Sequence, residues 1–158
     1  MARLVIVGDG PTRGECETLI EKLGIAPAVH LLGHRHDIPS ILAALDVVAL
    51  PSKREGFPFA VLEAMAAGKP TVAFNLPGLS QLIEHERTGL LVEPGDNRAL
   101  AAAIVQVLHD PSLAERMAAA AMERVKDFGI DAHVDRLVSL YQNIARPASS
   151  QPIHCDAA

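Results

Sequence analysis

The sequence predicts an α/β protein with a Rossmann-like parallel sheet of about five strands, flanked by helices and followed by a helical C-terminal part. Short apolar runs alternate with helical stretches up to about residue 92, and this alternation is typical of a parallel sheet. The runs are continuously apolar, which indicates strands buried on both faces. Beyond Asn97 the pattern is helical only.

Each expected strand is a short apolar run followed by a loop of Gly, Pro or charged residues. The five runs are 2–8, 28–33, 46–52, 71–74 and 89–92. Helix formers fill the segments between these runs, and Gly or Pro marks several of their ends. The expected helices are about 12–23, 38–45, 58–67 and 80–84.

Three more helices are expected over 98–110, 111–127 and 130–146. The last helix has an apolar face at helical spacing. Its members are Ile130, Val134, Leu137, Val138, Tyr141 and Ile144. Residues 1–146 are therefore expected to form one domain. Residues 147–158, rich in Ala, Ser, Gln and Pro, are expected to be a disordered tail.

Composition narrows the function classes. The chain has 158 residues and a net charge of −5 with a pI near 5.8, which argues against a nucleic-acid partner. Cys16 and Cys155 are expected to be free thiols, and the spacing of cysteines and histidines fits no metal site. The sequence shows neither a signal peptide nor a membrane-length apolar run, so a cytoplasmic location is expected.

The segment around residues 53–74 carries most of the candidate chemistry. Pro58 suits the first turn of a helix because its φ is fixed and it has no N–H to lose. Glu55 precedes this helix and Glu63 lies on it, with seven residues between them. A helix N-terminus favours a phosphate, and carboxylates accept hydrogen bonds from sugar hydroxyls. This pairing suits a nucleotide sugar.

Loop placement supports the same kind of ligand. The carboxyl ends of parallel strands meet at one edge of a sheet, where ligands of open α/β folds bind. The loops expected at that edge are Gly8–Gly10, Gly33–His36, Pro51–Glu55 and Asn75–Gly78. A phosphate-bearing ligand is therefore expected there.

The stretch EGFPFAVLE, followed by AMAAGKPTVAFNLPGLSQLIEHERTGLLVEPGD, resembles the donor-binding segment of the retaining glycosyltransferases of family 4 (group 1). VIVGDGP, VHLLGHRHDIPSILAALDVVALPS and LVSLY occur in the order that such proteins show, so the resemblance covers roughly Leu4 to Tyr141. It implies the C-terminal, donor-binding half of a GT-B fold. The implied reaction is transfer of a glycosyl group from a nucleotide-diphosphate sugar to an acceptor with retention.

The resemblance also implies roles for individual positions. Glu55 corresponds to the catalytic residue, a carboxylate that accepts hydrogen bonds from the donor sugar's hydroxyls and orients the sugar. Glu63 corresponds to the carboxylate that holds the ribose diol. The backbone amides facing the sugar and diphosphate are those of Gly56, Phe57 and Phe59, whereas Pro58 has none to donate. Further donor-binding positions are Gly8, Gly10, Arg35 and His36, with the last two near the base.

For partners, the resemblance implies a nucleotide-sugar donor and no bound metal or other cofactor. The diphosphate clamp of such enzymes, an Arg and a Lys after the first strand, has no counterpart here, and their acceptor binds mainly to an N-terminal domain. We therefore expect that domain or another chain as a partner, and possible peripheral membrane association of the full enzyme. Turnover by these residues alone is not expected.

The resemblance aligns Met1 just ahead of the family domain's second strand. In the strand order of a doubly wound sheet, the first strand would lie between 5–8 and 47–51. Two outcomes are open: these two runs pair directly, or the sheet is divided there.

Two other function classes compete. Gly8, Gly10 and Gly14 resemble the dinucleotide fingerprint of an oxidoreductase, but with one extra residue of spacing. No acidic residue ends the second strand, although Arg35 could face a 2′-phosphate. The other alternative is a non-catalytic nucleotide-binding or interaction domain. Asp9 is expected to cap the first helix rather than to bind a ligand.

Overall fold

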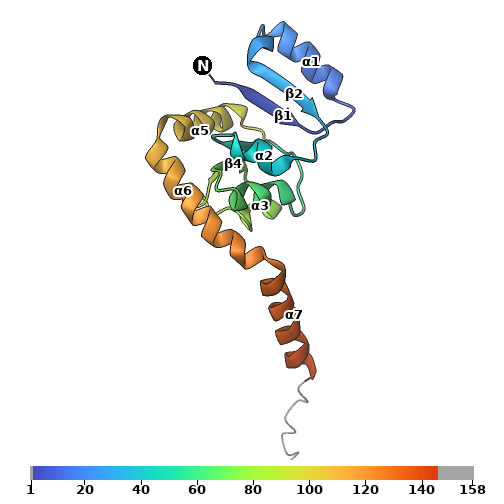
Figure 1. The fold of residues 1–158 in the computed structure, drawn as a ribbon, viewed down its shortest axis with the longest axis vertical. Coiled ribbons are helices and arrows are strands. Elements are labelled where there is room, and N and C mark those ends of the chain that lie inside the picture. The colour runs from blue at the N-terminus through green and yellow to red at the C-terminus, as the bar shows by residue number, and fades with distance from the viewer. Residues whose placement is uncertain (1, 146–158) are drawn as a thin grey trace, which may run out of the picture. The chain divides into compact units, whose positions relative to one another are not determined.

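The computed structural model of the chain describes residues 2–145, so the tail expected at 147–158 lies outside the described residues. The chain divides into two compact units, with the boundary between Ala44 and Leu45. Figure 1 shows the fold, with most of its helices and strands labelled. Each unit is described by itself.

The first unit contains a pair of parallel strands joined through a helix. Its elements are β1 (Leu4–Val7), α1 (Arg13–Lys22), the 3₁₀ turn η1 (Ala26–Ala28), β2 (Val29–Gly33) and α2 (Ile38–Ala43). β1 pairs with β2 in parallel, with Leu4 opposite Val29. The Gly8 N–H donates to the carbonyl of Gly33 at 2.8 Å, so the loops after both strands start side by side.

The second unit contains three parallel strands in the order β3-β4-β5. Its elements are β3 (Val48–Leu50), α3 (Phe59–Ala66), β4 (Thr71–Phe74), α4 (Pro77–Ser80), β5 (Leu90–Val92), α5 (Asn97–His109), α6 (Pro111–Arg124), the 3₁₀ turn η2 (Val125–Phe128) and α7 (Ile130–Ala145). The Asp96 and Asp110 carboxylates accept N–H bonds from the first turns of α5 and α6, which fixes where these helices begin.

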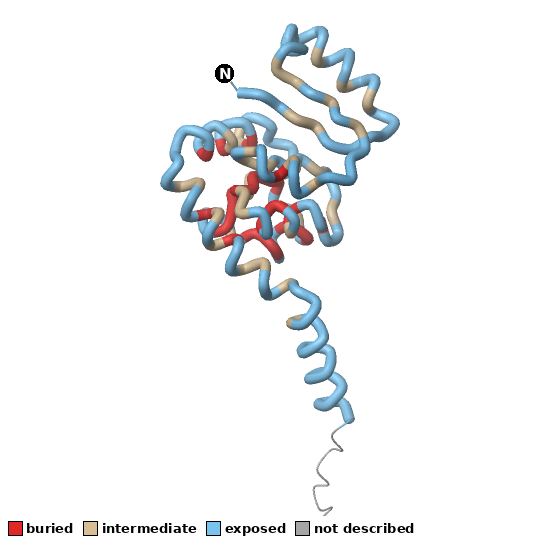
Figure 2. Tube along the Cα trace, viewed as in Figure 1, coloured by how far each residue is buried: buried red, intermediate tan, exposed pale blue. Residues whose placement is uncertain are grey.

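The core of the second unit lies on both faces of β4, the middle strand. Val72 and Phe74 pack with residues of α5 on one face, and Ala73 packs with residues of α3 on the other. α6 serves both clusters, through Met117 in one and Ala121 in the other. Figure 2 shows this buried centre in red. β4 is therefore the rigid element from which the neighbouring loops project.

The predicted α/β class with parallel strands and flanking helices is confirmed, and all five expected strands are present. Two of them form a sheet within the first unit and three form a sheet within the second. One helix prediction was wrong. The short helix expected at 80–84 is α4, which begins at Pro77 and ends at Ser80. Pro77 takes the first helical position, where a missing N–H costs nothing.

α7 forms where it was expected, but none of its residues is buried. Its apolar face is largely open to solvent, as the pale blue tube of Figure 2 shows. Ile130, for example, is 72% exposed and Tyr141 is 67% exposed. Of the helices formed by residues 2–145, none has the length and apolar character needed to cross a membrane.

Candidate functional site

Two loops of the second unit meet at the carboxyl edge of its sheet. β3 and β4 are neighbours in parallel register, with Leu50 opposite Ala73, so the segments that follow them leave the sheet together. Both segments line a hollow of about 480 Å³. Its lining residues are Lys53, Arg54, Glu55, Gly56, Leu76 and Pro77. The expected meeting of these two loops is therefore confirmed.

The two loops touch through their backbones. A Cβ added at Gly78 would lie 2.1 Å from the carbonyl oxygen of Gly56 and 2.9 Å from that of Glu55. No real Cβ tolerates such distances. Gly78 is fully buried in α4, so the loop that carries Glu55 rests directly on the start of that helix.

The N-terminus of α3 opens beside this loop without a side-chain cap. The residue before it, Pro58, is extended, with φ −78° and ψ 101°. Within residues 2–145, the N–H groups of Gly56, Phe57 and Phe59 donate to no protein acceptor. Backbone N–H groups at a helix start carry partial positive charge. These three amides can therefore bind an anionic group.

Two carboxylates flank these amides. Glu55 is half-buried in the loop, and Glu63 is exposed on α3, one turn beyond Phe59. Among the described residues neither carboxylate has a hydrogen bond or an ion pair, and the same holds for Lys53 and Arg54. Free acceptors, free cations and free amides are thus gathered around one helix start. This set suits a ligand that carries both hydroxyl groups and phosphate.

Phe128, which was not a candidate from the sequence, contacts the loop, and Arg124 contacts Phe128. The Phe57 ring lies 5.9 Å from the ring of Phe59 and 6.1 Å from that of Phe128 in η2. The guanidinium of Arg124, the last residue of α6, lies over Phe128 at 5.4 Å. About 70 positions separate Arg124 and Phe128 from the loop. No sequence pattern indicates that Phe128 contacts the ring of Phe57.

In the first unit, the glycine loops come together as expected. Gly8 has a φ of 116°, which only glycine adopts readily, and its N–H bonds the carbonyl of Gly33. The role expected for Asp9 was wrong. The residue that precedes α1 is Thr12, and no side chain caps this helix. Asp9 instead accepts the Gly10 N–H at 2.8 Å and lies 3.6 Å from the guanidinium of Arg13.

Arg35 and His36 follow β2. Arg35 makes a two-pronged ion pair with Asp37, with Nε–Oδ1 at 2.8 Å and Nη2–Oδ2 at 2.6 Å. The hydrogen bonds from Arg35 lower the pKa of the Asp37 carboxyl, and the same bonds raise the pKa of Arg35. His36 packs edge-to-face against His34, with 4.8 Å between ring centroids. The Arg35 side chain thus has a partner within its own loop.

The dinucleotide alternative finds little support in the glycines. The third glycine of that fingerprint allows a helix to pack closely on a strand. A Cβ added at Gly14 would meet no atom within 4 Å, so no close approach requires glycine there. Among residues 2–145, no group of three or more His, Cys, Asp or Glu side chains is placed to hold a metal ion.

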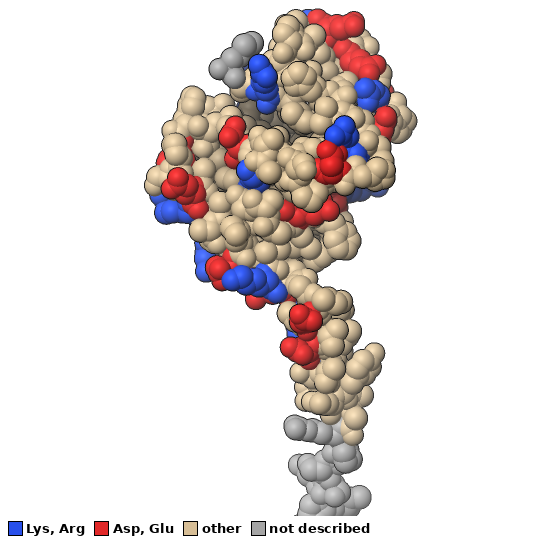
Figure 3. Space-filling view, viewed as in Figure 1, with Lys and Arg blue, Asp and Glu red and all other residues tan. Residues whose placement is uncertain are grey.

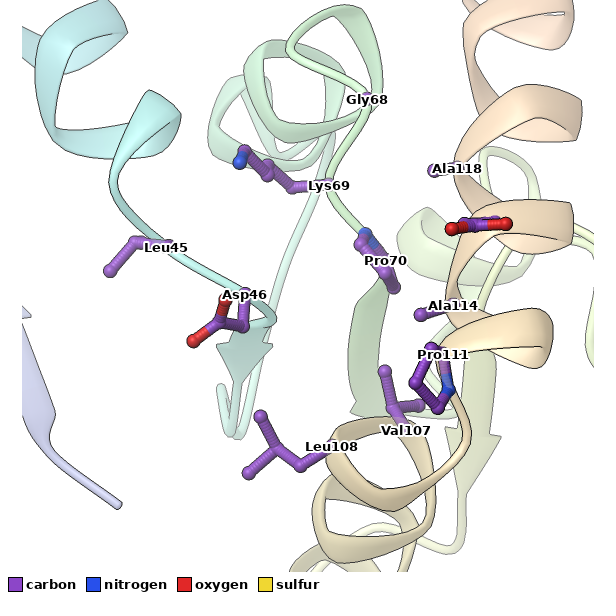
Figure 4. Close-up of a pocket in the computed structure, with 11 residues that line it drawn as sticks. Leu45, Asp46, Gly68, Lys69, Pro70, Val107, Leu108, Pro111, Ala114 and Ala118 are labelled. Atoms are coloured by element: carbon purple, nitrogen blue, oxygen red, sulfur yellow. The ribbon is translucent and has the colours of Figure 1, made fainter. Parts of the chain in front are cut away.

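A second cavity lies at the opposite, amino-terminal edge of the same sheet (Figure 4). Its volume is about 510 Å³, and its walls are mainly apolar residues of α5, α6 and the segments before β3 and β4. Its charged members are Asp46, Lys69 and Glu115. None of the expected site residues lines it.

On the face shown in Figure 3, acidic and basic side chains are interspersed.

The chain matches the family model described as "Glycosyl transferases group 1" over residues 1–124. One curated relative is the alpha-D-kanosaminyltransferase of Streptomyces kanamyceticus, which is 37% identical over 146 residues. The match covers 90% of this chain and 38% of that relative. The chain therefore spans well under half of the relative's length.

Solved structures are similar over the same region. The Anabaena protein Alr3699/HepE in complex with UDP superposes with a TM-score of 0.82 at 30% identity, covering 90% of this chain and 41% of that one. The same protein in complex with UDP-glucose gives a TM-score of 0.80. The C-terminal domain of the group 1 protein LpcC from Francisella tularensis gives 0.74 at 26% identity, covering 81% of this chain and 70% of that domain.

Proposed function

Because the chain belongs to the group 1 glycosyl transferases, we propose that the start of α3 and the loop before it bind a nucleotide-diphosphate sugar. This part would supply the donor site of a family 4 enzyme that transfers the glycosyl group with retention. The domain 1–146 would then be the C-terminal half of a GT-B protein. Its match to a solved C-terminal domain of a group 1 protein supports this assignment.

One observation carries the proposal: two carboxylates flank three amides, that of Phe59 at the start of α3 and those of Gly56 and Phe57 in the loop before it, and none of these groups has a partner among residues 2–145. Amides at a helix N-terminus bind phosphate well, since their dipoles point at the anion. Carboxylates accept hydrogen bonds from hydroxyl groups but repel phosphate. Glu55 and Glu63 stand at the flanks of this helix start, so a ligand with its anion on the amides and its sugars at the edges satisfies both.

The proposed roles follow from this placement. Glu55 in the loop accepts hydrogen bonds from the donor sugar and orients it. Glu63 on α3 holds the ribose diol. The amides of Gly56, Phe57 and Phe59 face the diphosphate and the sugar, whereas Pro58 only shapes the turn. For Gly8, Gly10, Arg35 and His36 of the first unit, a role in donor binding is proposed from the family resemblance alone.

In the proposed reaction, the bond between the anomeric carbon and the diphosphate oxygen breaks, and the nucleoside diphosphate leaves with that electron pair. A bond to an acceptor hydroxyl oxygen forms on the same face of the sugar, and the hydroxyl proton is released. We propose that this requires no bound metal and takes place in the cytoplasm. An N-terminal domain or another chain would bind the acceptor, and the full enzyme could associate peripherally with a membrane.

The test is titration calorimetry of the purified chain with UDP-, GDP- and ADP-glucose. The Anabaena structure with UDP-glucose makes the UDP sugar the first ligand to try. Glu63→Ala should weaken binding by about 1.5 to 3 kcal/mol, the cost of a charge-assisted hydrogen bond, or about 10- to 150-fold. Glu115→Ala, on the other cavity, is the matched control and should bind as the unchanged chain does. Equal affinity in Glu63→Ala, or tighter binding of NADP, would overturn the proposal.

A further inference from the structure

We propose that Phe128 and Arg124 are positioning residues that hold the Glu55 loop in its binding conformation. Both come from the end of α6 and the turn after it, and neither was a candidate from the sequence. This inference rests on the proposed donor site and adds to it the part of the fold that supports the loop.

The first support is a ring contact. Phe57 directly follows Gly56 in the loop, and 45% of its surface is exposed. Its ring is held between Phe59, at 5.9 Å, and Phe128, at 6.1 Å with a 55° tilt. Phe59 is itself 70% exposed, whereas Phe128 packs against the buried core. Phe128 is therefore the contact that ties the Phe57 ring to the rigid part of the unit.

The second element is Arg124, which fixes Phe128 in turn. Its Nε donates to the carbonyl of Leu82 and its Nη2 to that of Gln81, both at 2.7 Å. Its Nη1 pairs with Glu84 at 2.6 Å. The same guanidinium lies over the Phe128 ring at 5.4 Å, within the range of a cation–π interaction. Only 24% of this side chain is exposed.

These contacts connect the two residues that support the loop, Gly78 and Phe128. Gly78, at the start of α4, lies directly against the Gly56 carbonyl. Phe128 contacts the ring of Phe57, the residue that follows Gly56. The carbonyls that Arg124 binds belong to Gln81 and Leu82, directly after α4. Arg124 thus connects the backbone that supports Gly56 to the ring that supports Phe57.

Loss of these contacts should affect the sugar nucleotide and the free nucleoside diphosphate differently. The amides of Gly56 and Phe57 and the Glu55 carboxylate lie on the supported loop, whereas Glu63 lies on α3, whose core side is buried. Loss of the support should therefore cost ordering of the loop at each binding event. Affinity for the sugar nucleotide should fall more than affinity for the free nucleoside diphosphate.

Backbone ¹⁵N relaxation tests the support without any ligand. Phe128→Ala and Arg124→Ala should lower the order parameters of the Gly56 and Phe57 amides from about 0.85, the value of a rigid backbone, to below about 0.6, and Phe128→Tyr, which keeps the ring, should not. Two controls separate this effect from general destabilisation. Arg87→Ala removes the other cation on Glu84 but does not touch Phe128. Val107→Ala opens a cavity in the other core cluster.

Calorimetry then links the loop to binding. In Phe128→Ala, the ratio of UDP-glucose to UDP affinity should fall about fivefold to twentyfold, with Phe128→Tyr restoring it. Unchanged order parameters of the loop in both alanine variants, or an equal change in Val107→Ala, would overturn the positioning role. Absence of nucleotide binding by the unchanged chain would overturn the proposed donor site, and the relaxation data would still decide on the support.

Discussion

Gly78 supports Gly56 through direct backbone contact: a Cβ on the first would lie 2.1 Å from the carbonyl oxygen of the second. The backbone of Gly78 does not have a positive φ, so the position needs glycine for space and not for conformational freedom. Because Glu55 and Gly56 precede the free N-terminus of α3, this contact sets where the loop can place its carboxylate and its amide.

Gly78→Ala should therefore displace the Glu55 loop and weaken donor binding. The methyl group cannot fit, since backbone rather than a flexible side chain opposes it, and overpacking of this kind costs about 1 to 3 kcal/mol. Thermal unfolding should show the loss of stability, and calorimetry a lower affinity for UDP-glucose. Gly14→Ala is the matched control, because a Cβ there meets no atom within 4 Å. A Gly78→Ala protein that binds with full affinity would show that the loop position is not set by this contact.

Glu55→Gln should discriminate between ligands. The amide keeps the shape of the side chain but loses its charge, so hydrogen bonds from sugar hydroxyls become weaker while the diphosphate site is unaffected. Charge-assisted hydrogen bonds are about twice as strong as neutral ones. We expect the affinity for UDP-glucose to fall about tenfold, with UDP alone little changed. A parallel loss for both ligands would assign Glu55 to the loop's structure instead of the sugar.

The Arg35–Asp37 pair should be visible in a pH titration. The hydrogen bonds from Arg35, with a smaller effect of His36, hold the pKa of Asp37 below its ordinary value of 3.8. A carboxyl with a lowered folded pKa contributes stability at neutral pH, and that contribution is lost as pH falls through the folded pKa. NMR titration should show a lowered pKa of Asp37 in the unchanged chain and a higher one in Arg35→Ala. Arg98→Ala is the control and should leave the pKa of Asp37 low. The same titration curve in all three proteins would contradict the effect of Arg35 on Asp37.

Local sequence patterns were sufficient for the strands and most helices. Pro58 and the alanine-rich stretch after it predicted α3 to within one residue at each end, because helix propensity and Pro geometry are local properties. The meeting of the Glu55 loop with the loop after β4 was also predictable. It follows from parallel pairing alone.

Contacts between distant segments could not be predicted. Arg124 and Glu84 are ordinary charged residues in the sequence, and only the packing of α6 brings them together. Asp9 resembled a helix cap because of its position before α1, but Arg13 and the Gly10 N–H compete for its carboxylate. The cost of a side chain at Gly78 likewise depends on a segment about 20 residues away.

The two sheets should differ in how they open. All four residues of β4 are buried, with Val72 and Ala73 at 0% exposure, so its amides should exchange only through global unfolding. Among residues 2–44, Leu42 is the single buried hydrophobic residue, and β1 has none. The β1 amides should therefore exchange through a smaller opening with a lower free energy. Native-state hydrogen exchange in increasing denaturant measures both.

Val72→Ala provides the decisive comparison for this last prediction. It opens a cavity beside β4 and should lower the free energy of global unfolding by about 2 kcal/mol. Protection of the β4 amides should fall by that amount, since they report the global reaction. Protection of the β1 amides should stay the same, because the opening that exposes them does not involve the β4 core. If both strands lose protection equally in Val72→Ala, they open together, and the two units behave as one cooperative structure.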